Sequence, residues 1–173
     1  GFHPATFGRT ALELESFIPA TPYGIMQLLE RFDIDTQGKH AIVIARSNTV
    51  RRPISILLSP TGKYANATAT LAHSRTTALK NSVLQADIVV SALGKPNFVK
   101  ADMIKPGAVV VDVGITRVSD AAAPKGYRIV GDVDFDQVAP KTSFITPVPG
   151  GVGPMTIAML LKNTLLARER SEA

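Results

Sequence analysis

Hydrophobic residues along the chain fall into short runs separated by polar turns. Four runs rich in Ala, Val, Ile and Thr span residues 41–44, 67–72, 87–92 and 108–113, and two apolar pairs follow at 129–130 and 144–145. Short, mostly unalternated runs are typical of strands that are buried on both faces of a parallel sheet. The pattern therefore predicts four strands and two further short ones.

Apolar residues at helical spacing lie between these runs. Thr21 and Pro22 are predicted to start a helix as N-cap and first helical residue, a second helix starts at Pro53, and residues 77–85 form a third. The last helix starts near Pro154, and its apolar face follows helical spacing. The residues of that face are Ile157, Leu160, Leu161 and Leu165.

Two segments lack either pattern. Residues 1–20 show no clear periodicity and contain Pro4, Gly8 and Pro19, so we expect an extended connecting segment. Residues 118–126 are expected to form a loop. Strands that alternate with helices or turns indicate an α/β fold, a Rossmann-like, doubly wound, mainly parallel sheet with helices on both faces. This domain is expected to span residues 21–173, with the last helix included.

Composition and charge narrow the ligand classes. The chain has 173 residues with a net charge of +5 and an isoelectric point near 9.7, which favours an anionic ligand such as a phosphate or polyglutamate. There is no Cys, and the three His are scattered, so no metal site is predicted. No apolar run is long enough for a membrane span. Basic residues are not interleaved with aromatic ones, which argues against nucleic acid as a partner.

The segment Thr146–Thr156 holds three glycines and three prolines directly before the last helix. Proline fixes the path of such a loop, and glycine leaves its backbone bare, so a flat ligand can approach closely. Free N–H groups at the helix start favour a polar or negatively charged group. A tight strand-to-helix connection without a ligand explains the pattern equally well.

The strand ends also bear on the cofactor. The G-x-G-x-x-G fingerprint of dinucleotide sites is missing after the first strand. However, the second strand ends in Ser74 and Arg75 with no acid nearby, whereas NAD sites place Asp or Glu there. Arg46, Arg51 and Arg52 cluster near the first turn, where they suit a phosphate. These features favour NADP over NAD, although Arg51 or Arg52 taken alone is better explained as a solvated surface charge.

Nine segments, in this order, closely resemble the bifunctional methylenetetrahydrofolate dehydrogenase/cyclohydrolase family, and the resemblance runs the length of the chain. They are Gly1–Pro4, Thr21–Ile25, Arg46–Val50, His73–Thr76, Gly94–Pro96, Lys105–Ala108, Asp112–Ile115, Gly131–Val133 and Thr146–Thr156.

The resemblance implies NADP-dependent oxidation of 5,10-methylenetetrahydrofolate and hydrolysis of the methenyl product to 10-formyltetrahydrofolate. It implies a cytoplasmic homodimer of one-carbon metabolism and purine biosynthesis, with this chain as the cofactor-binding part. The catalytic Lys and Tyr are then expected in a preceding domain, with no catalytic residue in this chain. The family usually has glycine where Ala45 and Arg51 stand. A catalytically silent binding module and a binder of nucleic acid or acidic partners are the alternatives.

The resemblance also assigns site residues by position. Substrate contacts are expected from the loop before the last helix, at Pro147, Gly150, Gly151 and Val152. Gly151 and Gly153 are expected to be glycine because a side chain would intrude on stacked rings. The expected cofactor-binding residues are Ala45, Arg46, Ser47, Ser74, Arg75, Gly114, Ile115, Gly151, Gly153 and Thr156.

Overall fold

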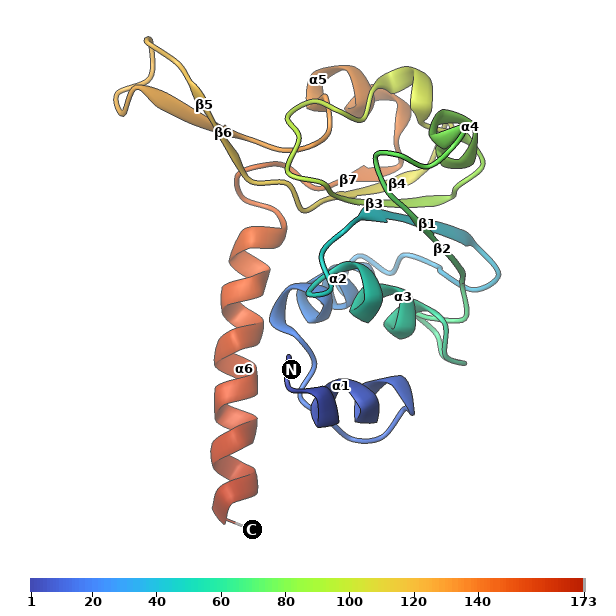
Figure 1. Ribbon diagram of the computed structural model, residues 1–173, viewed down its shortest axis with the longest axis vertical. Helices are drawn as coiled ribbons and strands as arrows, with labels where there is room; N and C mark the ends of the chain where they lie inside the picture. Colours follow the sequence, from blue (N-terminus) through green and yellow to red (C-terminus); the bar gives the residue numbers. More distant parts are fainter. Residues whose placement is uncertain (173) are drawn as a thin grey trace.

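Five parallel strands form the main sheet of the computed structural model, which describes residues 1–172 (Figure 1). The strand order is β2-β1-β3-β4-β7. The chain builds outward from β1 to β2 and then returns to the other side of β1, so the sheet has a switch point between β1 and β3. The bounds are β1 His40–Ala45, β2 Thr68–Ala72, β3 Ile88–Ala92, β4 Val109–Asp112 and β7 Phe144–Ile145.

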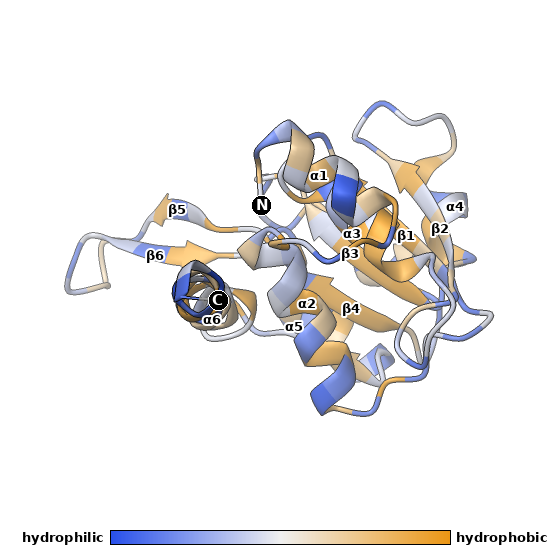
Figure 2. Cartoon of the chain, turned by 90° about the horizontal axis from the view of Figure 1, so that it is seen from below, coloured by the Kyte–Doolittle hydropathy of each residue, from blue (hydrophilic) through white to orange (hydrophobic). Residues whose placement is uncertain are grey.

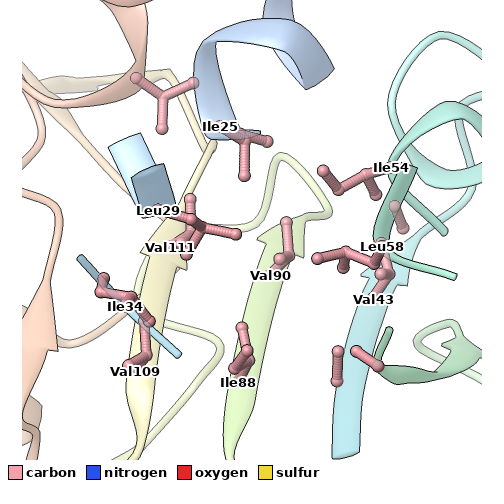
Figure 3. Packing of buried hydrophobic residues seen from close by; sticks show 14 residues of the cluster. Ile25, Leu29, Ile34, Val43, Ile54, Leu58, Ile88, Val90, Val109 and Val111 are labelled. Atoms are coloured by element: carbon pink, nitrogen blue, oxygen red, sulfur yellow. The ribbon is translucent and has the colours of Figure 1, made fainter. Parts of the chain in front are cut away.

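Alternate residues of the same strands enter two separate cores. Val43 of β1 and Val90 of β3 pack with Ile54 and Leu58 of α3 and with residues of α2, as Figure 3 shows. Their neighbours along the strands face the other side, where they meet α4, α5 and the segment around Ile104. Helical elements therefore cover both faces, which confirms the predicted Rossmann-like fold and explains why the strand runs are not alternated.

The helices occur close to their predicted places. The α-helices are α1 Pro4–Ala11, α2 Ala20–Arg31, α3 Arg51–Leu58, α4 Leu79–Leu84, α5 Phe135–Val138 and α6 Val152–Glu172, and the 3₁₀ turns are η1 Ala101–Met103 and η2 Ala139–Lys141. Residue 173, the end of the predicted domain, lies outside the described residues.

Two predictions near the start of the chain were wrong. Residues 4–11 form helix α1, where an extended segment was expected, because Pro4 suits a first turn and His3 Nδ1 accepts a hydrogen bond from the Ala5 N–H. Helix α2 begins two residues earlier than predicted, at Ala20, with Pro19 at the N-cap and no side-chain cap. Thr21 therefore lies inside the first turn and is not the N-cap.

A two-stranded antiparallel hairpin projects from the body (Figure 1). It consists of β5 Thr116–Ser119 and β6 Tyr127–Val130, so the loop predicted from residue 118 starts two residues later. The Arg117 guanidinium lies 4.9 Å from the ring centre of Tyr127 on the next strand, and this contact supports the pairing. The base of the hairpin joins the carboxyl end of β4.

Helix α6 is long and lies beside the body, and it is seen end-on in Figure 2. Its first turns pack closely on α2, where a Cβ on Gly24 would lie 3.0 Å from the Met155 Cβ. The predicted apolar face does not pack on the body, because each of its four side chains is 59–66% exposed. Only Val152 and Met159 of this helix are buried.

Candidate functional site

The residues that were predicted to hold a phosphate follow the first two strands and lie at one edge of the sheet. Ile44 of β1 pairs with Ala72 of β2, and Arg46 and Ser74 each follow two residues later. The loop after β7 begins at the same edge, because β7 runs parallel to β4. In doubly wound sheets, ligands bind beyond the carboxyl ends of the strands at the switch point. The residues predicted from separate turns therefore meet at the edge where a dinucleotide would bind.

A cleft of about 510 Å³ opens at this edge, between the loop after β4 and the loop before α6. Its wall is mostly backbone and apolar side chains, which suits a flat ring. The predicted site residues that line it are Gly114, Ile115, Pro147, Gly150, Gly151, Val152, Gly153 and Thr156. The other predicted cofactor residues lie outside this wall. Arg46, Ser47, Ser74 and Arg75 lie in the neighbouring turns, whereas Ala45 is the last residue of β1 and is fully buried in the core.

Sequence reasoning missed several lining residues. Val50 joins the cleft to the basic turn after β1, and Ile129 contributes from the hairpin base. Ile157 continues the cleft wall onto the exposed row of α6. These residues carry no polar signal and belong to elements far apart in the sequence, so only the fold brings them together.

The glycines of the cleft loop have different roles. Gly150 has φ +106°, a conformation that side chains rarely adopt. A Cβ on Gly151 would lie 2.5 Å from the Pro147 carbonyl oxygen, so the loop itself requires glycine there. At Gly153 a Cβ would meet no atom of residues 1–172 within 4 Å, apart from its own neighbours. Of these two positions, Gly153 is thus the one where a side chain would occupy free space in the cleft.

The basic turn after β1 is shaped by its own side chains. The Ser47 and Thr49 hydroxyls lie 2.5 Å apart, and the Thr49 N–H donates to Ser47 Oγ at 3.1 Å. Arg46 is exposed at the edge. Arg51 begins α3, and its Nε is buried without an acceptor among residues 1–172. The turn therefore presents positive charge, including one unsatisfied donor, where a phosphate would lie.

Thr156 connects the two helices that flank the cleft. Its hydroxyl lies 3.1 Å from the Thr21 hydroxyl of α2 and 3.1 Å from the Val152 carbonyl oxygen. The hydroxyl thus fixes the first turn of α6 against α2, at the mouth of the predicted ligand site.

Two buried carboxylates lie beneath the cleft and were not singled out from the sequence. Asp112 ends β4 and accepts N–H bonds from Gly114 at 2.8 Å, Asp132 at 3.0 Å and Val133 at 2.9 Å. Burial raises the pKa of Asp112 to about 6, and the neighbouring Asp132 carboxylate adds to the rise, whereas the three donors oppose it. Asp112 is therefore a buried hydrogen-bond acceptor, and three backbone N–H groups stabilise its negative charge.

The described residues contain no group of three or more His, Asp or Glu side chains placed to hold a metal ion. No helix within residues 1–172 combines the length and the apolar character that crossing a membrane requires.

Comparisons with known proteins agree with this geometry. The family model described as "Tetrahydrofolate dehydrogenase/cyclohydrolase, NAD(P)-binding domain" matches residues 19–172. The bifunctional protein FolD of Flavobacterium johnsoniae is 64% identical over 173 residues, which are 100% of this chain and 59% of that relative.

Solved structures give the same result. The bifunctional FolD enzyme of Campylobacter jejuni has a TM-score of 0.89 at 47% identity, covering 98% of this chain and 57% of its own. The Trypanosoma brucei FolD, complexed with NADP cofactor and inhibitor, has a TM-score of 0.90 at 41% identity, with the same two coverages. The chain thus spans just under three fifths of the length of these relatives. It belongs to the tetrahydrofolate dehydrogenase/cyclohydrolase family, as the NAD(P)-binding domain of that family.

Proposed function

We propose that this chain is the NADP-binding part of a methylenetetrahydrofolate dehydrogenase and methenyltetrahydrofolate cyclohydrolase. The observation that carries the proposal is the single edge on which Arg46, Ser74 and the Gly151 loop meet. A basic turn beside a cleft of bare backbone fits a ligand with a phosphate at one end and a flat ring at the other. The buried, unsatisfied Nε of Arg51 fits the same ligand, because a phosphate oxygen is a suitable acceptor.

Each predicted residue has a role in this arrangement. Arg46 and Ser74 hold the phosphate that distinguishes NADP from NAD, because no acid stands near Ser74 to hold a free ribose hydroxyl. Gly114 and Ile115 contact the nicotinamide end. The remaining cofactor contacts come from Ala45, Ser47, Arg75 and Thr156.

The substrate lies on the open side of the cleft. The loop residues Pro147, Gly150, Gly151 and Val152 line the cleft where the folate and the nicotinamide ring meet. Bound NADP⁺ supplies the acceptor for the hydride that leaves the one-carbon bridge of 5,10-methylenetetrahydrofolate. This chain's contribution is to orient the two rings against the mostly apolar cleft wall. Hydrolysis of the methenyl product to 10-formyltetrahydrofolate takes place in the same cleft.

The general acid–base groups are proposed to lie in a preceding domain, with residues 1–20 as the connection and the nucleotide-binding domain from residue 21 onward. Proton transfer requires a positioned side chain, and the described cleft wall holds no Lys, His or Tyr. The exposed row of α6, which continues the cleft wall through Ile157, fits contact with that domain. This chain alone is expected to catalyse neither step, and measurable dehydrogenase turnover by purified residues 1–173 would refute that expectation.

The whole protein is proposed to act as a cytoplasmic homodimer that joins through its nucleotide-binding domains and supplies one-carbon units for purine biosynthesis. The projecting hairpin supports the dimer, because an isolated two-stranded hairpin is marginally stable in water and gains from a second surface.

Ligand-dependent stability separates the candidate functions. A ligand that binds only the native state raises the melting temperature, so NADP is expected to raise it, whereas NAD has a smaller effect and an oligonucleotide none. An oligonucleotide shift without an NADP shift would contradict the proposal. A catalytically silent module would show the NADP shift and yet give no turnover when it is joined to the proposed preceding domain.

A further inference from the structure

Two buried aspartates and two glycines interlock below the cofactor cleft. Asp112 at the end of β4 accepts from the backbone of the segment after β6, at Asp132 and Val133. A Cβ on Gly114 would lie 2.5 Å from Asp132 Oδ1, and a Cβ on Gly131 would overlap the Asp112 carboxylate. Each carboxylate thus occupies the space that a side chain on the other segment would need.

Asp132 extends this connection to the third strand. Its side chain is fully buried and accepts from the Ser91 hydroxyl at 3.1 Å, the Leu93 N–H at 2.5 Å and the Lys95 N–H at 2.8 Å. The loop after β3 is therefore fixed to the same point as the loop after β4. Ionised carboxylates that accept several backbone N–H groups form strong, directional contacts, and a buried N–H that loses its acceptor is costly.

Asp112 also reaches the cleft loop through its backbone. The Asp112 N–H donates to Thr146 Oγ1 at 2.8 Å, and Thr146 is the first residue of the segment that carries the cleft glycines. Asp112 borders the cleft itself, although only 3% of its surface is exposed. One residue thus connects the Gly114–Ile115 wall, the start of the cleft loop and the segment after β6.

We propose that Asp112 and Asp132 are positioning residues that hold the loops after β3, β4 and β7 in the arrangement that the cofactor cleft requires. They do not touch the reacting atoms, and they act through the backbone groups they bind. The inference rests on the proposed function, because it assigns the two carboxylates a role at that site.

The replacement Asp112→Asn tests the proposal with almost no change in shape. Asn keeps one acceptor oxygen and replaces the other with an NH₂ donor, so at least one of the N–H groups of Gly114, Asp132 and Val133 then faces a donor. We expect NADP affinity to fall about tenfold or more, because the Gly114–Ile115 wall shifts. The amide resonances of Ile115 and Gly151 are expected to move as well.

Two control variants separate positioning from a loss of stability. Asp102→Asn removes a surface carboxylate that pairs with Lys80 and is expected to leave NADP affinity unchanged. Val83→Ala creates a cavity in the core on one face of the sheet and lowers the melting temperature without touching the cleft. The proposal is overturned if Asp112→Asn binds NADP within twofold of the unmodified chain, or no more weakly than Val83→Ala does.

A second measurement needs neither a stable variant nor NADP. The unmodified chain is labelled with NMR isotopes and titrated with acid. The amide chemical shifts of Ile115 and Gly151 are expected to change over the same pH range as the chemical shift of the Asp112 carboxyl carbon. If only the amides bonded to Asp112 follow it, the carboxylate does not position the cleft and the proposal fails. The readout is independent of the proposed function, whose own failure would appear as absent NADP binding. The other charged groups facing Asp112 or bordering its cavity, to be followed separately, are Asp132, Arg128, Asp134 and Asp136.

Discussion

Gly131 lies directly against the carboxylate of Asp112, so close that a Cβ on Gly131 would overlap Oδ2. The same Cβ would also lie 2.9 Å from a methyl group of Val148 in the cleft loop. This glycine is therefore required by packing, since its φ is not among the positive values in the chain.

Replacement of Gly131 by Ala is expected to lower the free energy of unfolding by about 3 kcal/mol or more, because the buried Asp112 carboxylate cannot move away without breaking its hydrogen bonds. Urea denaturation measures the change. Gly8→Ala is the matched control, since a Cβ there meets no described atom within 4 Å inside α1, and it is expected to raise the stability by up to about 1 kcal/mol. Equal effects of the two replacements would contradict the packing argument.

Gly151 and Gly153 are expected to respond differently to the same replacement. Gly151→Ala forces a Cβ against the Pro147 carbonyl and should lower both the melting temperature and NADP affinity. Gly153→Ala places a methyl group in free space and should leave the melting temperature within a few degrees, while NADP affinity falls about tenfold. Calorimetric titration with NADP gives the affinity. Full affinity in Gly153→Ala would show that no ring lies at this position.

The proposed phosphate contact predicts a change of cofactor preference. Arg46→Ala should weaken NADP binding by about 10- to 100-fold, the range for a lost charge-assisted hydrogen bond, and leave NAD binding within about twofold. Lys125→Ala, at the hairpin tip, removes the same charge elsewhere and serves as the control. Parallel losses for NADP and NAD in Arg46→Ala would place the residue away from the distinguishing phosphate.

Arg51 stands where the family usually has glycine, and its guanidinium either contacts a phosphate or obstructs one. We expect contact, so Arg51→Gly and Arg51→Met should both weaken NADP binding by about tenfold, because both remove the charge. Met keeps most of the bulk. If bulk obstructs the site instead, Gly would bind NADP more tightly than the unmodified chain and Met would not.

The buried Asp112 predicts a specific pH dependence of stability. Its pKa rises from 3.8 in the unfolded chain to about 6 in the native state, so the native state holds the proton more tightly. Stability from this group is therefore greatest below about pH 4 and decreases by roughly 2 to 3 kcal/mol as the pH rises to about 6. The effect is isolated by measuring the free energy of unfolding at several pH values and subtracting the value for Asp112→Asn from the value for the unmodified chain. A difference that rises with pH would contradict it.

The sheet could be predicted because burial on both faces leaves a direct mark on the sequence. β1, β3 and β4 consist largely of Ala, Val and Ile, which no other common element requires in such short runs. Helix α1 was missed because Pro4 and Gly8 favour an extended segment when read as breakers, whereas in the structure Pro4 occupies the first turn of the helix. The hairpin was placed only in part, since residues 116–119 have no turn signal of their own.

The site was predictable where it depends on backbone, and not where it depends on long-range hydrogen bonds. Glycines and prolines between residues 147 and 154 mark a bare, fixed loop wherever they occur. The long-range bonds of the Asp112 and Asp132 carboxylates reach backbone groups 20 to 39 residues away, and no spacing rule relates such positions. The exposure of the α6 row was also hidden, because helical spacing gives an apolar face without saying what covers it.

That row has a consequence for the chain as a free molecule in a cell. The exposed apolar row of α6 is a hydrophobic patch, and chaperones and proteases bind such patches. Its residues are Ile157, Leu160, Leu161 and Leu165. The lifetime and abundance of the chain in the cell would then depend more on how fast another surface covers this row than on the stability of the sheet. A single Leu161→Lys replacement would interrupt the apolar row, and it is expected to make the free chain more soluble and less readily bound by chaperones and proteases.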